Sequence, residues 1–336
     1  MKGRSFGQWL VSAWYRGAGW LVLLRPLSAL YARIARRRRA RALADPSLSQ
    51  PPVPLIVVGN VTLGGTGKTP MVIWLVRHFQ QRGLKVGVVS RGYGARPPSF
   101  PWLVNPERDM PAEVGDEPWL IASRCHVPLM VDPQRPRAVA RLIRDHQPDL
   151  LISDDGLQHY RMSRTLELVM IDHQRGLGNR RCLPEGPLRE PVERLASVDF
   201  IIRNGALEDA PDSFAMGLRP TALVALRSGE RVDPQHWPGS RRVNAVAGIG
   251  NPQRFFDSLR QLGLDPVEHV FPDHARYNAQ SFAALDPALP LLMTEKDAVK
   301  CAAFAQDDWW YLSVEAVLSE AFACQLDQRL NLHRPD

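Results

Sequence analysis

A glycine-rich segment that ends in lysine and threonine carries the clearest chemistry in this sequence. It reads TLGGTGKT over residues 62–69 and follows a short apolar run. Glycines let consecutive backbone N–H groups curl around phosphate oxygens, and the start of a following helix favours negative charge. Lys68 is expected to reach the β- and γ-phosphates of a nucleotide, and Thr69 to place its hydroxyl on Mg²⁺. The segment therefore predicts a loop that binds ATP and magnesium, formed by Thr62, Leu63, Gly64, Gly65, Thr66, Gly67, Lys68 and Thr69.

Two adjacent carboxylates follow a second apolar run, PDLLISDD over residues 148–155. An apolar strand that ends in acids is the expected partner of a phosphate loop, because carboxylates at that sheet edge hold magnesium or its waters. Asp154 and Asp155 would point to opposite sides of an extended strand. We expect one of them to serve the metal and the other to orient a neighbour or to cap a turn.

Short apolar runs that alternate with helical stretches predict the sheet that positions these residues. A helix is expected over residues 71–80, directly after the loop. Buried parallel strands are expected at 55–58, 86–89, 150–153, 166–171 and 200–202. This alternation is typical of an α/β fold: a mostly parallel sheet of the P-loop NTPase type, with helices on both faces.

The pattern restarts beyond about residue 205. We expect a turn over 248–252, a helix over 253–262, and strands at 244–247, 267–271 and 291–293. These elements predict a smaller second α/β domain that closes over the active site. The expected domains are a basic segment at 1–45, a P-loop domain at 46–205 that begins with a linker over 46–54, and the second domain at 206–336.

Positive charge is concentrated at the N-terminus. The formal net charge is +7, yet residues 1–44 carry +10 without any acid, so the remainder sums to −3. A groove that tracks nucleic acid would spread its basic residues over the folded domain, so we expect no nucleic-acid partner. We also infer no obligate protein partner. The cysteines lack C-x-x-C spacing, which argues against a zinc site and a disulfide scaffold; they are Cys125, Cys182, Cys301 and Cys324.

Apolar residues in the N-terminal segment recur at steps of three and four and predict an amphipathic helix. They are Phe6, Trp9, Leu10, Ala13, Trp14, Trp20, Leu21, Leu24 and Leu27. Arg16 and Arg25 interrupt the apolar run, so it falls short of the roughly 20 residues that a spanning helix needs. Pro26 is expected to kink or end the first helix. We expect this segment to lie in a membrane interface with its arginines on anionic lipid. The alternatives are a helix packed on its own domain and a nucleic-acid arm at 36–39.

Eight short motifs occur in order along nearly the whole chain. They are VGNVTLGGTGKTP (58–70), SRGYG (90–94), GDEP (115–118), DDGLQH (154–159), PEGPLRE (184–190), AGIGNP (247–252), FPDH (271–274) and TEKDAVK (294–300). This ordered set resembles the tetraacyldisaccharide 4′-kinase family. The resemblance implies transfer of the γ-phosphate of ATP to the 4′-hydroxyl of a tetraacyldisaccharide 1-phosphate in lipid A biosynthesis. It also implies a peripheral protein on the cytoplasmic face of the bacterial inner membrane.

The resemblance places the proton transfer in a cleft between the two predicted domains. Asp116 matches the proposed catalytic base and His274 its supporting partner, and Asp273 is expected to orient His274 through a hydrogen bond. A carboxylate suits this role, because a sugar hydroxyl is a poor nucleophile until its proton is accepted. Taken alone, Asp116 would equally suit a helix cap and His274 a structural position. The TEK residues at 294–296 are expected to shape this cleft, or to form a turn.

Further residues gain roles from the same resemblance. Arg189 is expected to stabilise charge on the transferred phosphoryl group and Glu190 to join the metal shell; a surface ion pair is the alternative. Ser90, Arg91 and Tyr93 are expected to contact the sugar–phosphate end of the lipid, unless SRGYG is merely a loop after a strand.

Three other classes of protein fit the sequence less well. Partitioning ATPases carry a signature lysine immediately before GGTGKT, where this chain has Leu63. A GTPase metallochaperone would carry an N-K-x-D motif and clustered cysteine or histidine ligands, and the sequence has neither. A soluble small-molecule kinase would leave the apolar, arginine-rich N-terminus without a role.

Overall fold

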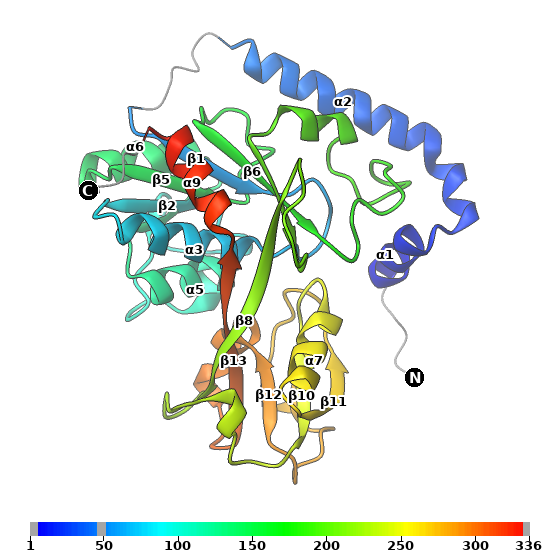
Figure 1. Cartoon of the computed structure of the whole chain (residues 1–336), viewed down its shortest axis with the longest axis vertical. Coiled ribbons are helices and arrows are strands. Elements are labelled where there is room, and N and C mark those ends of the chain that lie inside the picture. The colour runs from blue at the N-terminus through cyan, green and yellow to red at the C-terminus, as the bar shows by residue number, and fades with distance from the viewer. Residues whose placement is uncertain (1–5, 46–51, 332–336) are drawn as a thin grey trace.

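The computed structural model describes residues 6–45 and 52–331. Within them the chain forms a thirteen-stranded sheet with helices on both faces (Figure 1). The strand order is β11-β10-β12-β13-β8-β7-β6-β1-β5-β2-β4-β3, with β9 paired to β8. The helices are α1 (Phe6–Arg16), α2 (Arg25–Leu43), α3 (Lys68–Gln80), α4 (Pro111–Val114), α5 (Asp116–Cys125), α6 (Arg135–His146), α7 (Pro252–Gln261), α8 (Glu295–Cys301) and α9 (Glu320–Arg329).

The strands are β1 (Leu55–Gly59), β2 (Val86–Ser90), β3 (Trp102–Leu103), β4 (Leu129–Val131), β5 (Leu150–Asp154), β6 (Leu166–Asp172), β7 (Phe200–Asn204), β8 (Phe214–Ala225), β9 (Arg231–Val232), β10 (Arg242–Ala247), β11 (Asp265–Val270), β12 (Leu291–Thr294) and β13 (Trp309–Leu318). Most neighbouring pairs are parallel; β3–β4, β8–β9 and β8–β13 are antiparallel. The predicted mostly parallel α/β sheet is confirmed.

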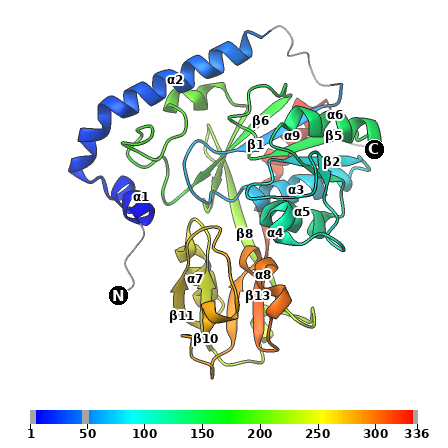
Figure 2. The ribbon, with the colours of Figure 1, turned by 180° about the vertical axis from the view of Figure 1, so that it is seen from behind.

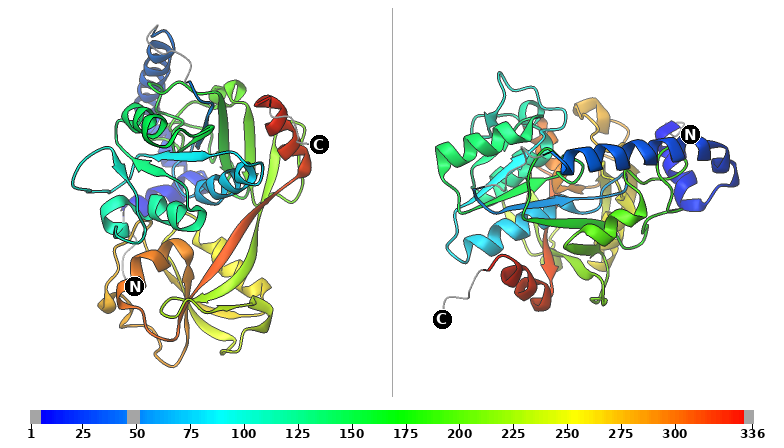
Figure 3. Two further views of the ribbon diagram at one scale, coloured as in Figure 1. Left: turned by 90° about the vertical axis from the view of Figure 1, so that its left-hand side faces the viewer. Right: turned by 90° about the horizontal axis from the view of Figure 1, so that it is seen from above.

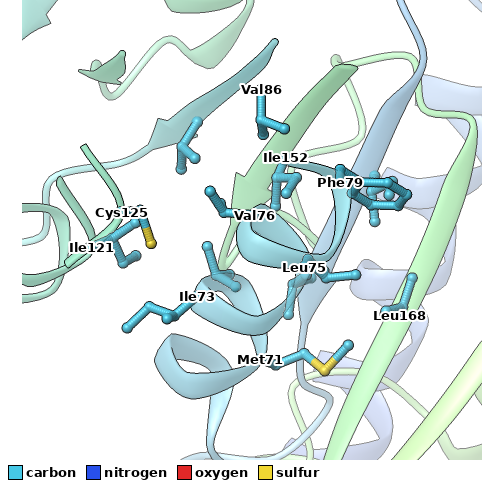
Figure 4. Close-up of a cluster of buried hydrophobic side chains, with 14 of the residues drawn as sticks. Met71, Ile73, Leu75, Val76, Phe79, Val86, Ile121, Cys125, Ile152 and Leu168 are labelled. Carbon is cyan, nitrogen blue, oxygen red and sulfur yellow. The ribbon is translucent and has the colours of Figure 1, made fainter. Parts of the chain in front are cut away.

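Strand β1 shows why the central strands read as continuous apolar runs. Ile56 and Val58 pack in the core formed with α3 and α5, whereas Leu55 and Val57 pack with α6 on the other face. A parallel strand covered on both faces needs an apolar side chain at every position. Figure 4 shows the α3 side of this core, where Phe79 and its helical neighbours meet the sheet.

All the strands predicted from the sequence are present, with ends shifted by a few residues. The helix after the loop begins at Lys68, three residues earlier than predicted, because Gly67 with φ of 91° ends the loop directly before it. The short strands β3, β4 and β9 and the longer strands β8 and β13 were not predicted. Gly217 and Pro220 interrupt the pattern of β8, and Pro220 lies opposite a register shift between Ser313 and Val314 of β13.

Strands β8 and β13 form a long antiparallel ribbon between the two halves of the molecule (Figures 1 and 2). After β13 the chain returns to the first half, where Phe322 and Leu326 of α9 join the core around α3. The predicted domain boundary near residue 205 stays a prediction. Residues 46–51 of the predicted linker lie outside the described residues.

The N-terminal segment folds as α1, a 3₁₀ helix over Gly19–Leu24, and α2, which runs along one side of the first half (Figure 3). The expectation that Pro26 ends the first helix is wrong. That helix ends at Arg16, before Gly17 with φ of 67°, and Pro26 lies in the first turn of α2. A proline fits there because the first N–H groups of a helix have no partner within it. No described helix is both long and apolar enough to cross a membrane.

Candidate active site

A cavity of about 960 Å³ opens beside the phosphate loop and extends between the two halves. We call its two sides the loop wall and the facing wall. The loop wall consists of the glycine-rich loop with its lysine and the acids at the end of β5: 63–69, Asp154 and Asp155. Asn60 and Thr62 lie behind this wall and do not line the cavity. The facing wall consists of the side chains at the start of α5 and those that meet them from the second half: Asp116, Glu117, Asp273, His274 and Lys296.

Side-chain hydrogen bonds and close contacts at its glycines fix the backbone of the loop. The buried Asn60 donates from Nδ2 to the carbonyls of Thr62 at 2.7 Å and Gly64 at 3.3 Å. A Cβ at Gly67 would lie 2.2 Å from Nδ2 of Asn204, so this position accepts only glycine. Lys68 is the first residue of α3, and its Nζ lies 3.5 Å from Oδ1 of Asn60. Phosphates are favoured at such a helix end.

The two acids of β5 have different surroundings. Asp155 takes φ of 48° and places its carboxylate 3.4 Å from Lys68 and 3.5 Å from Arg189. Burial alone would raise the pKa of Asp155, but these cations outweigh it and lower the pKa. Asp154 is buried and accepts a hydrogen bond from Ser90 Oγ at 3.3 Å. Burial, then the charges of Glu117 and Asp155, raise the pKa of Asp154 to about 7.

These residues fit a magnesium ion. Oδ1 of Asp154 is buried and has no hydrogen-bond partner in the described part of the chain. Mg²⁺ prefers hard oxygen ligands and is usually held by one or two carboxylates, substrate phosphates and water. Among the described residues no three His, Cys, Asp or Glu side chains gather into a complete cage. The available side-chain oxygens therefore suit a metal ion that is also bound by the phosphates of a nucleotide, rather than one held by protein side chains alone.

Glu190 does not join the other predicted metal ligands. It is buried and does not line the cavity. Its carboxylate accepts hydrogen bonds from Tyr160 Oη and from Gln158 Nε2 at 2.8 Å, and it lies 3.2 Å from Nε of Arg194. Gln158 also donates to the carbonyl of Asn60 at 3.0 Å. Glu190 thus supports the loop wall from behind instead of facing the metal position.

The facing wall brings together side chains that are far apart in the sequence. His274 Nδ1 lies 3.8 Å from Oδ2 of Asp116, within ion-pair range but longer than a hydrogen bond. Lys296 Nζ donates to Glu117 at 2.9 Å and to Asp273 at 3.2 Å. Burial alone would raise the pKa of Glu117, but Lys296 and then Lys68 outweigh it and lower the pKa to about 2.

Two details differ from the sequence-based expectations. Asp273 does not bond the ring of His274: its Oδ1 accepts the backbone N–H of His274 at 3.1 Å, while Nε2 lies 3.9 Å away. The same carboxylate oxygen pairs with Lys296, whose Nζ also lies 3.5 Å from Nε2 of His274. Asp116 begins α5 but does not cap it, because Gly115 holds the cap position without a side-chain bond.

The SRGYG residues divide between the two walls. Ser90 is buried against Asp154, so it supports the loop wall. Tyr93 is 69% exposed, and its ring lies 5.1 Å from that of His274. Arg91 is exposed and lines the cavity between them.

Sequence reasoning did not single out several residues of the site. Asn60 and Glu117 both lie inside motifs quoted above: Asn60 comes two residues before Thr62, and Glu117 directly follows Asp116. Gly250 packs so closely on the loop that a Cβ there would lie 1.9 Å from the backbone nitrogen of Gly65. The signal for it was the AGIGNP turn, which contains Gly248 and Gly250 and to which no role was assigned.

Comparison with known proteins agrees with this geometry. Residues 20–331 match the family model described as tetraacyldisaccharide-1-P 4′-kinase. The chain is 58% identical over 327 residues to the tetraacyldisaccharide 4′-kinase of Pseudomonas syringae pv. syringae, covering 97% of this chain and 98% of that protein. It is 59% identical over 327 residues to the enzyme of the same name from Pseudomonas paraeruginosa, with 97% and 98% covered.

Among solved structures, the chain resembles the "apo" form of LpxK from Aquifex aeolicus in complex with ATP. The TM-score is 0.75 and the identity 26%, over 93% of this chain and 98% of that one. The family model and the close relatives cover almost the entire length, including both walls of the cavity. The chain therefore belongs to the tetraacyldisaccharide-1-P 4′-kinase family.

Proposed function

We propose that this protein uses ATP to phosphorylate the 4′-hydroxyl of a tetraacyldisaccharide 1-phosphate in lipid A biosynthesis. The observation that carries the proposal is the shared cavity: a phosphate loop lies on one side, and an acid–histidine pair lies opposite. A kinase needs both, because it must hold the triphosphate and accept the proton of the attacking hydroxyl.

The side chains have complementary roles in this reaction. Lys68 and the loop amides bind the phosphates of ATP, and Arg189 balances charge on the transferred phosphoryl group. The 4′-oxygen of the sugar attacks the γ-phosphorus while the bond from that phosphorus to the β–γ bridging oxygen breaks, and ADP leaves. Asp116 accepts the proton of the hydroxyl, and His274 supports Asp116 in this role. Arg91 and Tyr93 contact the sugar–phosphate end of the lipid.

We assign the metal position to Thr69, Asp154 and Asp155. A bound Mg²⁺ would neutralise phosphate charge there. We leave Glu190 out of this set, because its carboxylate pairs with Tyr160, Gln158 and Arg194.

The direct test uses γ-labelled ATP, Mg²⁺ and a tetraacyldisaccharide 1-phosphate dispersed in detergent. Label should move to the lipid in the presence of the full-length protein. The same lipid already phosphorylated at the 4′ position is the control, and it should accept no label. Label released only as inorganic phosphate would contradict the proposal.

We further propose that the N-terminal segment holds the enzyme on the anionic cytoplasmic face of the inner membrane. Large apolar side chains remain exposed there, including Leu23, Leu27, Leu30 and Ile34. Arginines flank them along α2. Each basic residue near an anionic surface contributes on the order of 1 kcal/mol, which salt weakens. Other faces of the same segment pack on the protein, so both the membrane and the packed-helix interpretation have support.

Liposome sedimentation tests this second proposal. The full-length protein should pellet with vesicles that contain anionic lipid, more strongly at low salt, and a variant that lacks residues 1–44 should not. Equal binding by both proteins would show that the segment is not the anchor.

A further inference from the structure

The first two residues of the phosphate loop, Thr62 and Leu63, lie where the loop meets the packing of the N-terminal helices. Leu63 packs against an apolar cluster whose buried members are Ala13, Trp14 and Leu21. The backbone N–H of Leu63 donates to the carbonyl of Pro187 at 2.9 Å, and Thr62 forms a bridge with Leu188. The side chain of Leu63, which precedes Gly64 and Gly65, is therefore held by contacts with the helices rather than surrounded by solvent.

The helices are themselves fixed to the strip of chain that runs along the loop. Trp14 Nε1 donates to the carbonyl of Pro184 at 2.9 Å, and Ser28 Oγ donates to the carbonyl of Cys182 at 2.8 Å. Arg25 forms an ion pair with the buried Glu185 at 3.2 Å. The segment thus contacts the loop both directly and through residues 182–188.

A second route joins the same helices to the other side of the loop. The guanidinium of Arg175 lies over the ring of Tyr15, 5.4 Å from its centroid. Nη1 of Arg175 donates to the carbonyl of Gly250 at 2.5 Å. Gly250 is the residue that packs on the backbone of Gly65. A Cβ at Gly64 would lie 3.7 Å from Nη1 of Arg175, so the guanidinium borders the loop itself.

We infer that Leu63, Arg175 and Tyr15 are positioning residues through which the N-terminal helices set the conformation of the phosphate loop. The segment that we propose to bind the membrane would then also tune ATP affinity. The physical reason is that loop amides must converge on phosphate oxygens, and a displacement of about 1 Å at such a site is costly. The inference rests on the proposed function for its biological meaning, but it is measurable by ATP binding alone.

The test measures the dissociation constant of ATP with Mg²⁺ by calorimetry, using full-length protein in detergent without lipid substrate. Leu63→Ala should weaken ATP binding about tenfold. Tyr15→Leu removes the ring under Arg175 and should weaken it by about threefold, the scale of an exposed cation–π contact. Tyr15→Phe keeps the ring and should bind ATP like the wild type. Melting temperatures are recorded for each variant.

Leu30→Ala is the matched control, because Leu30 is 56% exposed on α2. It should weaken liposome binding and leave ATP affinity unchanged. If Leu63→Ala fails to fold, the comparison of Tyr15→Leu with Tyr15→Phe tests the inference without it. ATP affinity within 1.5-fold of wild type in Tyr15→Leu, or equal losses in Tyr15→Leu and Tyr15→Phe, would overturn the inference.

The two proposals can fail separately. A wild type that binds ATP but labels no lipid would contradict the kinase assignment and leave the coupling intact. Variants that bind ATP normally while the wild type labels the lipid would contradict the coupling alone.

Discussion

The loop wall is held mainly by first-half side chains that bond the loop backbone, with Gly250 of the second half packed on Gly65, whereas the facing wall depends on side chains that meet across the cavity. Asn60 fixes the loop carbonyls, and a buried carboxylate network supports Asn60 from behind. On the facing wall, Lys296 and His274 reach Glu117 and Asp116 from the second half, which the β8–β13 ribbon joins to the first. The nucleotide side is therefore supported by hydrogen bonds to the loop backbone, and the opposite side is formed where side chains of the two halves meet.

Asp116→Asn should have the largest effect on turnover and little effect on ATP affinity. The amide keeps the shape of the side chain but cannot accept the proton of the sugar hydroxyl. We expect kcat to fall by about 10²- to 10⁴-fold, the usual range for a general base. Steady-state kinetics and ATP calorimetry on the same preparation check this. A large loss of ATP affinity would instead place Asp116 in the nucleotide and metal shell.

Lys68→Ala should disrupt phosphate binding at the loop wall. It removes the ammonium group that faces the phosphates, and kcat/KM should fall by at least about 10²-fold, the scale of one preorganised electrostatic group. Lys85→Ala is the control, because Lys85 is exposed and remote from the cavity. Near-normal activity of Lys68→Ala would remove the phosphate-loop assignment.

Lys296→Met should produce a smaller loss that appears in kcat rather than in ATP binding. The variant leaves Glu117 and Asp273 without their shared cation. Without that cation the facing wall loosens and Asp116 and His274 are less well placed, so we expect about a tenfold fall in kcat. Lys85→Met should match the wild type. An unchanged kcat in Lys296→Met would show that the pairing across the cavity is not needed.

The smallest expected effect concerns the pH dependence of folding stability, through His159, which lies shortly after β5. Burial, then Arg135 and Arg164, lower the pKa of His159 to about 4. An unfolded histidine binds its proton near pH 6.5, so between pH 6.5 and 4 the unfolded state binds more protons and stability falls as pH falls. His159→Gln should flatten the decline of Tm over this range. His126→Gln, at an exposed position, should not. Equal slopes for His159→Gln and the wild type would contradict this.

The two walls also differ in how well the sequence predicts them. Lys68, Asp154 and Asp155 follow directly from a local motif and an apolar strand that ends in acids. The pairing of Asp116 with His274 joins residues 158 positions apart in the chain, and it required a family resemblance. No local pattern shows that Glu190 faces Tyr160 and Gln158, because its partners depend on how residues 157–194 fold back along β1. The β8–β13 ribbon was not predicted because Gly217 and Pro220 break the alternation of apolar and polar residues in β8.

A double-mutant cycle on Asp116 and His274 is the sharpest test of whether residues from both halves act as one unit in proton transfer. Single-turnover rates with bound ATP are measured for the wild type, Asp116→Asn, His274→Ala and the double variant. If the pair acts as a unit, His274→Ala should slow transfer, and the double variant should be barely slower than Asp116→Asn alone, because such losses are strongly non-additive. Fully multiplicative losses would show that the two residues act independently and would contradict the account.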